Sequence, residues 1–319
     1  MINEFELKQR FETDGFVRVS GLLSAHEVAA LRSAVDGQME ELAGTPTSYD
    51  FQALSDYAFS GSESELGREE ERLDVELYKA VIKNDGDARS LDDVPPGQAK
   101  GRFGFNAGGW HRDARIARVA LTSEVSSFAS MLLNDQPLRL WEDTTFVKEP
   151  GATVRSAFHQ DKHFACFEGE QDIVAWVALD RADEDSGALE YVRGSHLWNE
   201  TFAPNMFFAQ TTLPGAPSAK LPDIEANRDA YDIVRVDAQP GDVVFHHGLT
   251  VHGAGGNRSA RIRRAISFRY FGPDCTYCLR PGSLPQSWVH HSLTSGASLD
   301  CPDYPVARSR RIDAPRRAA

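Results

Sequence analysis

The 319-residue chain is poor in cysteine, has fewer basic than acidic residues and contains no long apolar run. Its four cysteines are too few for the disulfide framework that holds many secreted proteins together. No apolar stretch approaches the roughly 20 residues that a membrane-spanning helix requires. The N-terminal stretch MINEFELKQRF is charged and lacks the apolar centre of a signal peptide. We therefore expect a cytoplasmic protein with no membrane association.

Lysine and arginine total 34 against 47 aspartates and glutamates, which gives a net charge of −13. A chain this acidic is a poor ligand for nucleic acids and for anionic membrane surfaces. Hydrophobic residues make up 41% of the chain and charged residues 25%, a balance typical of globular proteins. The composition therefore argues against nucleic acid as a partner, and it predicts no oligomeric state.

The first third of the chain reads as a helical flank. GFVRVSGLLSAHEVAALRSAV predicts a short strand followed by a helix, and residues 113–134 have the apolar spacing of another helix. Residues 48–101 are polar and rich in acidic clusters, so we expect helices and loops outside the core there.

From residue 136 onward the pattern changes to short β-rich runs bounded by glycine, proline and aspartate. Six such runs predict a β-sandwich or barrel. Residues 198–232 interrupt them with a long stretch rich in proline, asparagine and alanine, which is typical of a lid. We expect one domain, built from a flank and lid to about 135, a core over about 136–272 and a C-terminal tail over 273–319.

The stretch FHQDKHF, residues 158–164, carries the first chemical signal. On a strand, residues two apart point to the same side, so His159 and Asp161 would project together and Gln160 away from them. An imidazole beside a carboxylate forms two corners of a metal site, and the third ligand must come from elsewhere. His163 shares their side, where it could touch substrate or serve as a surface or supporting residue.

His252 is the best candidate for the third ligand. It lies in GDVVFHHGLTVHGAGGNRSARIRRAISFRY, where a hairpin centred between Asn257 and Arg258 would place it roughly opposite Arg263. A guanidinium beside a metal requires an anion between them, and a dicarboxylate gripped by Arg263 meets that requirement.

Two alternatives to this ligand set remain open. His246 and His247 could replace His252 as the ligand, or the polar residues could form only a buried hydrogen-bonded cluster. Two histidines and one carboxylate suit non-haem Fe(II) and also zinc.

Five segments, taken together and in this order, resemble the phytanoyl-CoA dioxygenase family of Fe(II)/2-oxoglutarate oxygenases. They are HQDKHF, DIVAWVALD, EDSGALEYVRGSH, GDVVFHHGLTVHGAGGNRS and RRAISFRY. The resemblance covers about residues 136–272. It implies a mainly β fold with flanking helices (α+β), whose core is a double-stranded β-helix of the jelly-roll, cupin-like kind. It also implies Fe(II) as cofactor, 2-oxoglutarate and O2 as co-substrates, and hydroxylation of an unactivated C–H bond of a small molecule, with release of succinate and CO2.

The resemblance also assigns roles to residues. It makes His159, Asp161 and His252 the iron ligands and Arg263 the partner of the distal carboxylate of 2-oxoglutarate. The positions that match the wall of the co-substrate site are Gln160, Trp176 and Thr144.

The chain departs from the family at one position near the expected co-substrate. The family often has a small hydroxyl residue two positions after the distal histidine, where this chain has Ala254. One hydrogen bond to 2-oxoglutarate is then either lost or supplied by another group, for which Thr250 and Ser267 are the candidates. Related halogenases lack the carboxylate ligand, so Asp161 favours hydroxylation.

Other functions and roles remain open. A β-barrel binding or sensor protein without turnover, or a redox-neutral metal enzyme such as a zinc hydrolase, would keep the same residues. The aromatic residues Phe103, Phe105 and Trp110 could wall a substrate pocket or pack in the core. The sequence does not predict the substrate.

Overall fold

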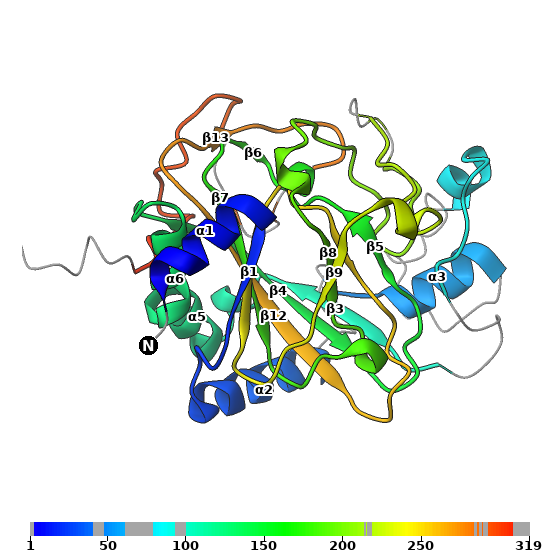
Figure 1. The fold of residues 1–319 in the computed structure, drawn as a ribbon, viewed down its shortest axis with the longest axis horizontal. Helices are drawn as coiled ribbons and strands as arrows, with labels where there is room; N and C mark the ends of the chain where they lie inside the picture. Colours follow the sequence, from blue (N-terminus) through cyan, green and yellow to red (C-terminus); the bar gives the residue numbers. More distant parts are fainter. Residues whose placement is uncertain are drawn as a thin grey trace, which may run out of the picture.

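The computed structural model describes residues 3–40, 48–60, 79–92, 100–213, 215, 219–283, 286, 289 and 293–308. Two antiparallel sheets form its centre (Figure 1). The seven-stranded sheet has the order β1 (Phe16–Val19), β10 (Val243–His247), β7 (Asp172–Ala178), β12 (Arg263–Phe271), β4 (Arg139–Lys148), β3 (Phe103–Ala107) and β2 (Ser48–Asp50). The four-stranded sheet has the order β5 (Ser156–His159), β11 (His252–Ala254), β8 (Leu189–Val192) and β9 (Ile233–Val236). A small ladder joins β13 (Thr276–Tyr277) to β6 (Phe167–Glu168).

The expected fold class is confirmed: antiparallel sheets dominate, and helices flank them. Figure 1 shows α1, α5 and α6 on one side of the sheets and α3 on the other. The helices are α1 (Glu4–Asp14), α2 (Ala25–Glu40), α3 (Phe51–Ser60), α5 (Ala114–Thr122) and α6 (Glu124–Leu132). Short 3-10 helices are η2 (Gly109–His111), η3 (Lys162–Phe164), η4 (Glu184–Ser186), η5 (Ser195–Leu197) and η6 (Arg228–Ala230). The division into flank, core, lid and tail stays a prediction.

Strand β7 shows how the main sheet buries both faces. Ile173, Ala175 and Val177 join helix side chains in the largest apolar cluster, while Trp176 joins a second cluster between the two sheets. A strand covered on both faces has no polar side, which explains the nearly continuous apolar run of β7.

The helical character predicted for residues 113–134 is confirmed, although the structure divides the segment into two helices at Ser123. Ser123 has extended backbone angles (φ −90°, ψ 178°), and its hydroxyl accepts a hydrogen bond from the Val125 amide at 3.1 Å. The serine thereby ends α5 and caps the N-terminus of α6.

The prediction that residues 48–101 lie outside the core is wrong for the part that contains β2 and α3. Phe51 and Leu54 are buried, and the Phe51 ring meets the Phe103 ring edge-on at 5.4 Å. The acidic cluster SESELGREEERLD, residues 62–74, lies outside the described residues. Among the residues that are described, the helices are too short or too polar to cross a lipid bilayer.

Candidate metal centre and its cavity

His159 and His252 stand side by side on neighbouring strands. The antiparallel pairing of β5 with β11 aligns the two residues, and their ring centroids lie 4.4 Å apart. Directly opposed residues on paired strands bring their side chains within contact distance. Both imidazoles are buried, with 5% of each residue exposed.

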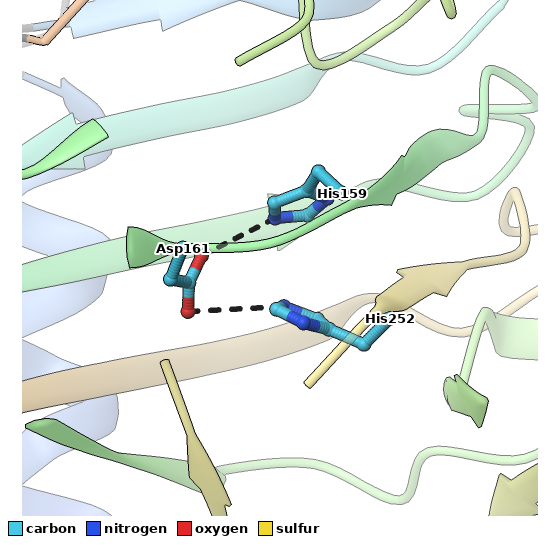
Figure 2. A group of neighbouring side chains, drawn as sticks. All are labelled: His159, Asp161 and His252. Atoms are coloured by element: carbon cyan, nitrogen blue, oxygen red, sulfur yellow. Dashed lines mark ion pairs between the residues drawn. The ribbon is translucent and has the colours of Figure 1, made fainter. Parts of the chain in front are cut away.

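Asp161 completes the group, although not from a strand as its spacing predicted. Strand β5 ends at His159, and Asp161 has helical angles (φ −73°, ψ −28°) at the start of η3. The turn still brings its carboxylate to 3.3 Å from His159 Nε2 and 3.9 Å from His252 Nε2, as Figure 2 shows. The three potential ligand atoms all lie within 4.8 Å of one another, which is close enough to share one metal ion.

Hydrogen bonds orient the two imidazoles for ligation. His159 Nδ1 lies 2.7 Å from the Ala157 carbonyl oxygen, and His252 Nδ1 lies 2.9 Å from the Thr250 carbonyl oxygen. When Nδ1–H donates to a carbonyl, the lone pair of Nε2 is left for a metal. Both Nε2 atoms face Asp161.

The charge states of the group also suit a cation. Burial raises the pKa of the Asp161 carboxyl, but His252, His159 and His246 outweigh it and hold the pKa well below its usual value. Burial holds the pKa of the His252 imidazole well below its usual value. An ionised carboxylate and a neutral imidazole are the states in which these groups bind metals.

His246, the alternative ligand, occupies a supporting position. Its Nε2 lies 3.1 Å from Asp161 Oδ2, and its Nδ1 lies 3.0 Å from the Tyr191 hydroxyl oxygen. Both ring nitrogens of His246 are therefore engaged in hydrogen bonds, whereas Nε2 of His252 lies beyond hydrogen-bond distance of Asp161. The geometry favours His252 as the ligand and makes His246 a contact that orients Asp161.

The predicted hairpin between His252 and Arg263 is wrong. Strand β11 belongs to the four-stranded sheet, where His252 pairs with His159, and β12 belongs to the seven-stranded sheet, where Arg263 pairs with Lys148. The glycine-rich connection carries the chain from one sheet to the other. Asn257 fixes this corner, since its side-chain amide donates to the carbonyl oxygens of Lys148 (2.8 Å) and Arg261 (2.7 Å).

A cavity of about 200 Å³ nevertheless brings the predicted triad and Arg263 together, because both sheets line it. Arg263 is 2% exposed, and its Nε–H donates a long hydrogen bond of 3.4 Å to the Ser186 carbonyl oxygen. Burial lowers the pKa of the Arg263 guanidinium to about 10, against a smaller raising effect of Asp180. Within the described parts of the chain Arg263 has no ion-pair partner, so an anion in the cavity would be its natural counter-charge.

The other predicted co-substrate residues divide into two groups. Thr144 and Trp176 line the cavity, and the Arg263 guanidinium carbon lies 5.9 Å from the centre of the Trp176 ring. The cavity lining does not include Gln160, whose amide is bound to the backbone of Glu200, Phe202 and Leu249. Gln160 therefore joins loops around the site, as its expected opposite direction from His159 and Asp161 implies.

Thr250 and Ser267 were the two candidates for a hydroxyl group that would replace the one missing at Ala254, and the structure distinguishes between them. Ser267 and Ala254 both line the cavity, and Ser267 pairs with Trp176 on the neighbouring strand. The Thr250 hydroxyl is fully buried and donates to the Gly15 carbonyl oxygen at 2.8 Å. Ser267 is thus the better placed of the two.

The aromatic candidates and His163 are also placed. Phe103 and Phe105 line the cavity, whereas Trp110 packs against the helical cluster. His163 is buried, and its Nδ1 lies 2.5 Å from the carbonyl oxygen of Phe202, which belongs to the predicted lid. His163 is not among the residues that line the cavity.

Sequence reasoning missed several cavity residues. Glu142 and Phe146 flank Thr144 at intervals of two on β4, a spacing that could have identified them as sharing its side. Phe207 comes from the predicted lid and lies 5.0 Å from the His159 ring, ring centre to ring centre. Arg269 donates a hydrogen bond to the Asp161 carbonyl oxygen at 2.9 Å, and no local sequence pattern predicts a contact between residues so far apart in the chain.

Known proteins resemble this chain in sequence and in fold. The model of the family described as phytanoyl-CoA dioxygenase (PhyH) matches residues 11–265. Peroxisomal phytanoyl-CoA dioxygenase from Rattus norvegicus is 32% identical over 136 residues, which is 42% of this chain and 39% of the rat enzyme. The match thus spans about two fifths of that relative.

Two solved structures show a similar fold at low identity. The epimerase SnoN, solved with Fe3+, alpha ketoglutarate and nogalamycin RO, has a TM-score of 0.64 at 23% identity over 96% of this chain and 98% of its own. EctD from S. alaskensis, solved with 2-oxoglutarate and 5-hydroxyectoine, has a TM-score of 0.57 at 17% identity over 93% and 86%. With the family model matching most of the chain, this protein belongs to the phytanoyl-CoA dioxygenase family.

Proposed function

We propose that this protein is an Fe(II)- and 2-oxoglutarate-dependent oxygenase that hydroxylates a C–H bond of a small molecule. The observation that carries the proposal is the meeting, in one cavity, of the His159, Asp161 and His252 triad with the buried guanidinium of Arg263, which forms no ion pair with any residue that the structure describes. A metal site alone suits many reactions. A metal site and a buried cation in the same cavity suit a dianionic oxo acid that binds both.

The residues present fit such a centre. His159 and His252 offer Nε2 and Asp161 an ionised oxygen, so three protein ligands would leave further positions of an octahedral metal open. Bound there, Fe(II) would supply the activation of dioxygen. Arg263 would hold the distal carboxylate of 2-oxoglutarate. Ser267, four residues further along the same strand, and Thr144, its partner on β4, line the same cavity.

The surrounding residues orient the ligands and keep water out. His246 and Arg269 bind the side chain and the backbone carbonyl of Asp161, which limits rotation of the carboxylate. Phe207 and Phe164 contact the His159 ring at centroid distances of 5.0 and 5.8 Å. Apolar rings around a reacting centre lower its hydration and strengthen its electrostatic interactions.

Hydroxylation is the outcome we favour within the family. Asp161 supplies the carboxylate ligand that halogenating relatives lack. SnoN, which shares the fold, is an epimerase, so the fold supports other outcomes as well.

The test is anaerobic addition of Fe(II) and 2-oxoglutarate to the purified full-length protein. We expect a weak metal-to-ligand absorption band in the visible region, and slow succinate formation once oxygen is admitted. Absence of the band, or activity that persists with zinc and without oxygen, would overturn the proposal in favour of a redox-neutral metal enzyme. Binding of 2-oxoglutarate without succinate formation from any substrate would support a binding or sensor protein.

A further inference from the structure

Glu142 is a cavity residue to which the proposed function gives no role. It lies on β4, where Glu142, Thr144 and Phe146 alternate along the strand and all line the cavity. The side chain of Glu142 is partly buried and hydrogen-bonds to the side chain of Gln286. Glu142 thus presents a carboxyl group to the space in which a substrate would bind.

Strand register places Glu142 at the metal end of the cavity. Glu142 pairs with Arg269 on β12, Arg269 pairs with Val174 on β7, and Val174 pairs with His246 on β10. These four residues form one row across the sheet, and His246 and Arg269 both contact Asp161. Arg263 lies six residues before Arg269 on β12, roughly 20 Å away along the strand.

The charges at this end of the cavity are matched, apart from Glu142. The Arg269 guanidinium is bound to Asp172 through two hydrogen bonds, of 3.1 and 2.7 Å. The Asp161 carboxylate faces the His159 and His252 imidazoles. Glu142 has no lysine or arginine within ion-pair distance among the residues that the structure describes.

The environment of Glu142 disfavours its isolated negative charge. Burial raises the pKa of the Glu142 carboxyl to about 7; Arg269 opposes this rise, and Asp143 and Asp161 add smaller raising effects. A cation beside Glu142 would remove that penalty, whereas an anion would increase it.

Aromatic rings cover another part of the cavity wall. Phe207 contacts Phe51 at 4.9 Å and Phe146 at 5.9 Å, and Phe105 contacts Phe146 at 5.5 Å, all measured between ring centroids. Tyr49 extends the group, at 6.1 Å from Phe105. Aromatic faces attract ammonium groups and also bury apolar carbon, so they suit the body of an apolar amine.

We propose that Glu142 binds the protonated amine of a substrate whose remaining body is apolar or aromatic. This inference rests on the proposed function, because Glu142 acts from beside the metal triad. The amine would lie at the metal end, and the apolar body would contact the aromatic wall. Anionic substrates, thioesters of coenzyme A among them, would meet an unmatched carboxylate and bind poorly.

The experiment uses three probes with the same aromatic body: 2-phenylethylamine, 2-phenylethanol and 3-phenylpropionate. The full-length protein is loaded anaerobically with Fe(II) and 2-oxoglutarate, and each probe is titrated while the visible band is recorded. We expect the amine to perturb the band at a concentration at least tenfold lower than the alcohol or the acid. Loss of the band before any probe is added would refute the proposed function, and so is distinguishable from failure of this inference.

Two variants complete the test. Glu142→Gln keeps the shape of the side chain and removes its charge, so we expect at least tenfold weaker amine binding and unchanged binding of the alcohol. Glu170→Gln, at an exposed position, is the matched control and should bind all three probes as the wild-type protein does. Equal losses for amine and alcohol in Glu142→Gln, unchanged amine binding, or no amine preference in the wild-type protein would each overturn the assignment.

Discussion

Replacement of Arg263 by methionine should greatly weaken 2-oxoglutarate binding without destabilising the ligand-free protein. The Arg263 guanidinium is almost fully buried, the one hydrogen bond that it makes to the described residues is long, and burial already lowers its pKa to about 10. Without its ligand, therefore, Arg263 is a buried charge with little compensation. Removing such a charge should leave the free energy of unfolding within about 1 kcal/mol of the wild-type value.

The effect on affinity should be far larger. A buried, hydrogen-bonded pair of guanidinium and carboxylate loses about 3–5 kcal/mol when one partner is removed. At 1.4 kcal/mol for each factor of ten, the Kd for 2-oxoglutarate should rise by roughly 150-fold to 4000-fold.

Anaerobic thermal unfolding with Fe(II) measures both quantities. A ligand at 100 times its Kd stabilises the folded state by about 2.7 kcal/mol, so the wild-type Tm should rise with 2-oxoglutarate. The Arg263→Met protein should match the wild-type Tm without 2-oxoglutarate and show no rise with it. Arg261→Met is the control, because Arg261 lies two residues away, has an exposed side chain and forms an ion pair with Asp183.

Two results would refute this reasoning. A large fall in the ligand-free Tm of Arg263→Met would show that Arg263 stabilises the fold itself and is not an uncompensated charge in the ligand-free protein. A normal rise with 2-oxoglutarate would show that the distal carboxylate binds elsewhere.

Three further predictions concern the metal centre and its support. Asp161→Ala should bind no iron in metal analysis and show no visible band with 2-oxoglutarate, and stoichiometric iron would contradict the ligand assignment. His246→Phe should remain folded by circular dichroism but bind Fe(II) about 10-fold to 100-fold more weakly, because Asp161 loses an orienting hydrogen bond. Asp172→Asn leaves the Arg269 charge buried and should lower the free energy of unfolding by about 3–5 kcal/mol in denaturant titrations, against less than about 1 kcal/mol for the exposed control Asp232→Asn. Because the folded state lowers the pKa of Asp172 below 3.8, the wild-type advantage should be complete above that pH and disappear as the pH falls further; equal losses in both variants would refute it.

The sequence by itself determined the fold class and the ligand types. Short β-rich runs with turn residues between them predict antiparallel sheets, because alternation and turn chemistry are local properties of the chain. The spacing of His159 and Asp161, with His252 and Arg263 in a later stretch, identified the four residues that the structure brings to one cavity.

Only the tertiary structure decided how those residues meet. A local pattern fixes which side of a strand a residue faces, but it does not fix the partner strand, since pairing depends on contacts between distant segments. His252 therefore proved to lie opposite His159 rather than Arg263, and a turn rather than a strand positioned Asp161. Glu142 could be placed near the triad only from the structure, for the same reason. Its position follows from the register of four strands, and a local stretch of sequence does not determine that register.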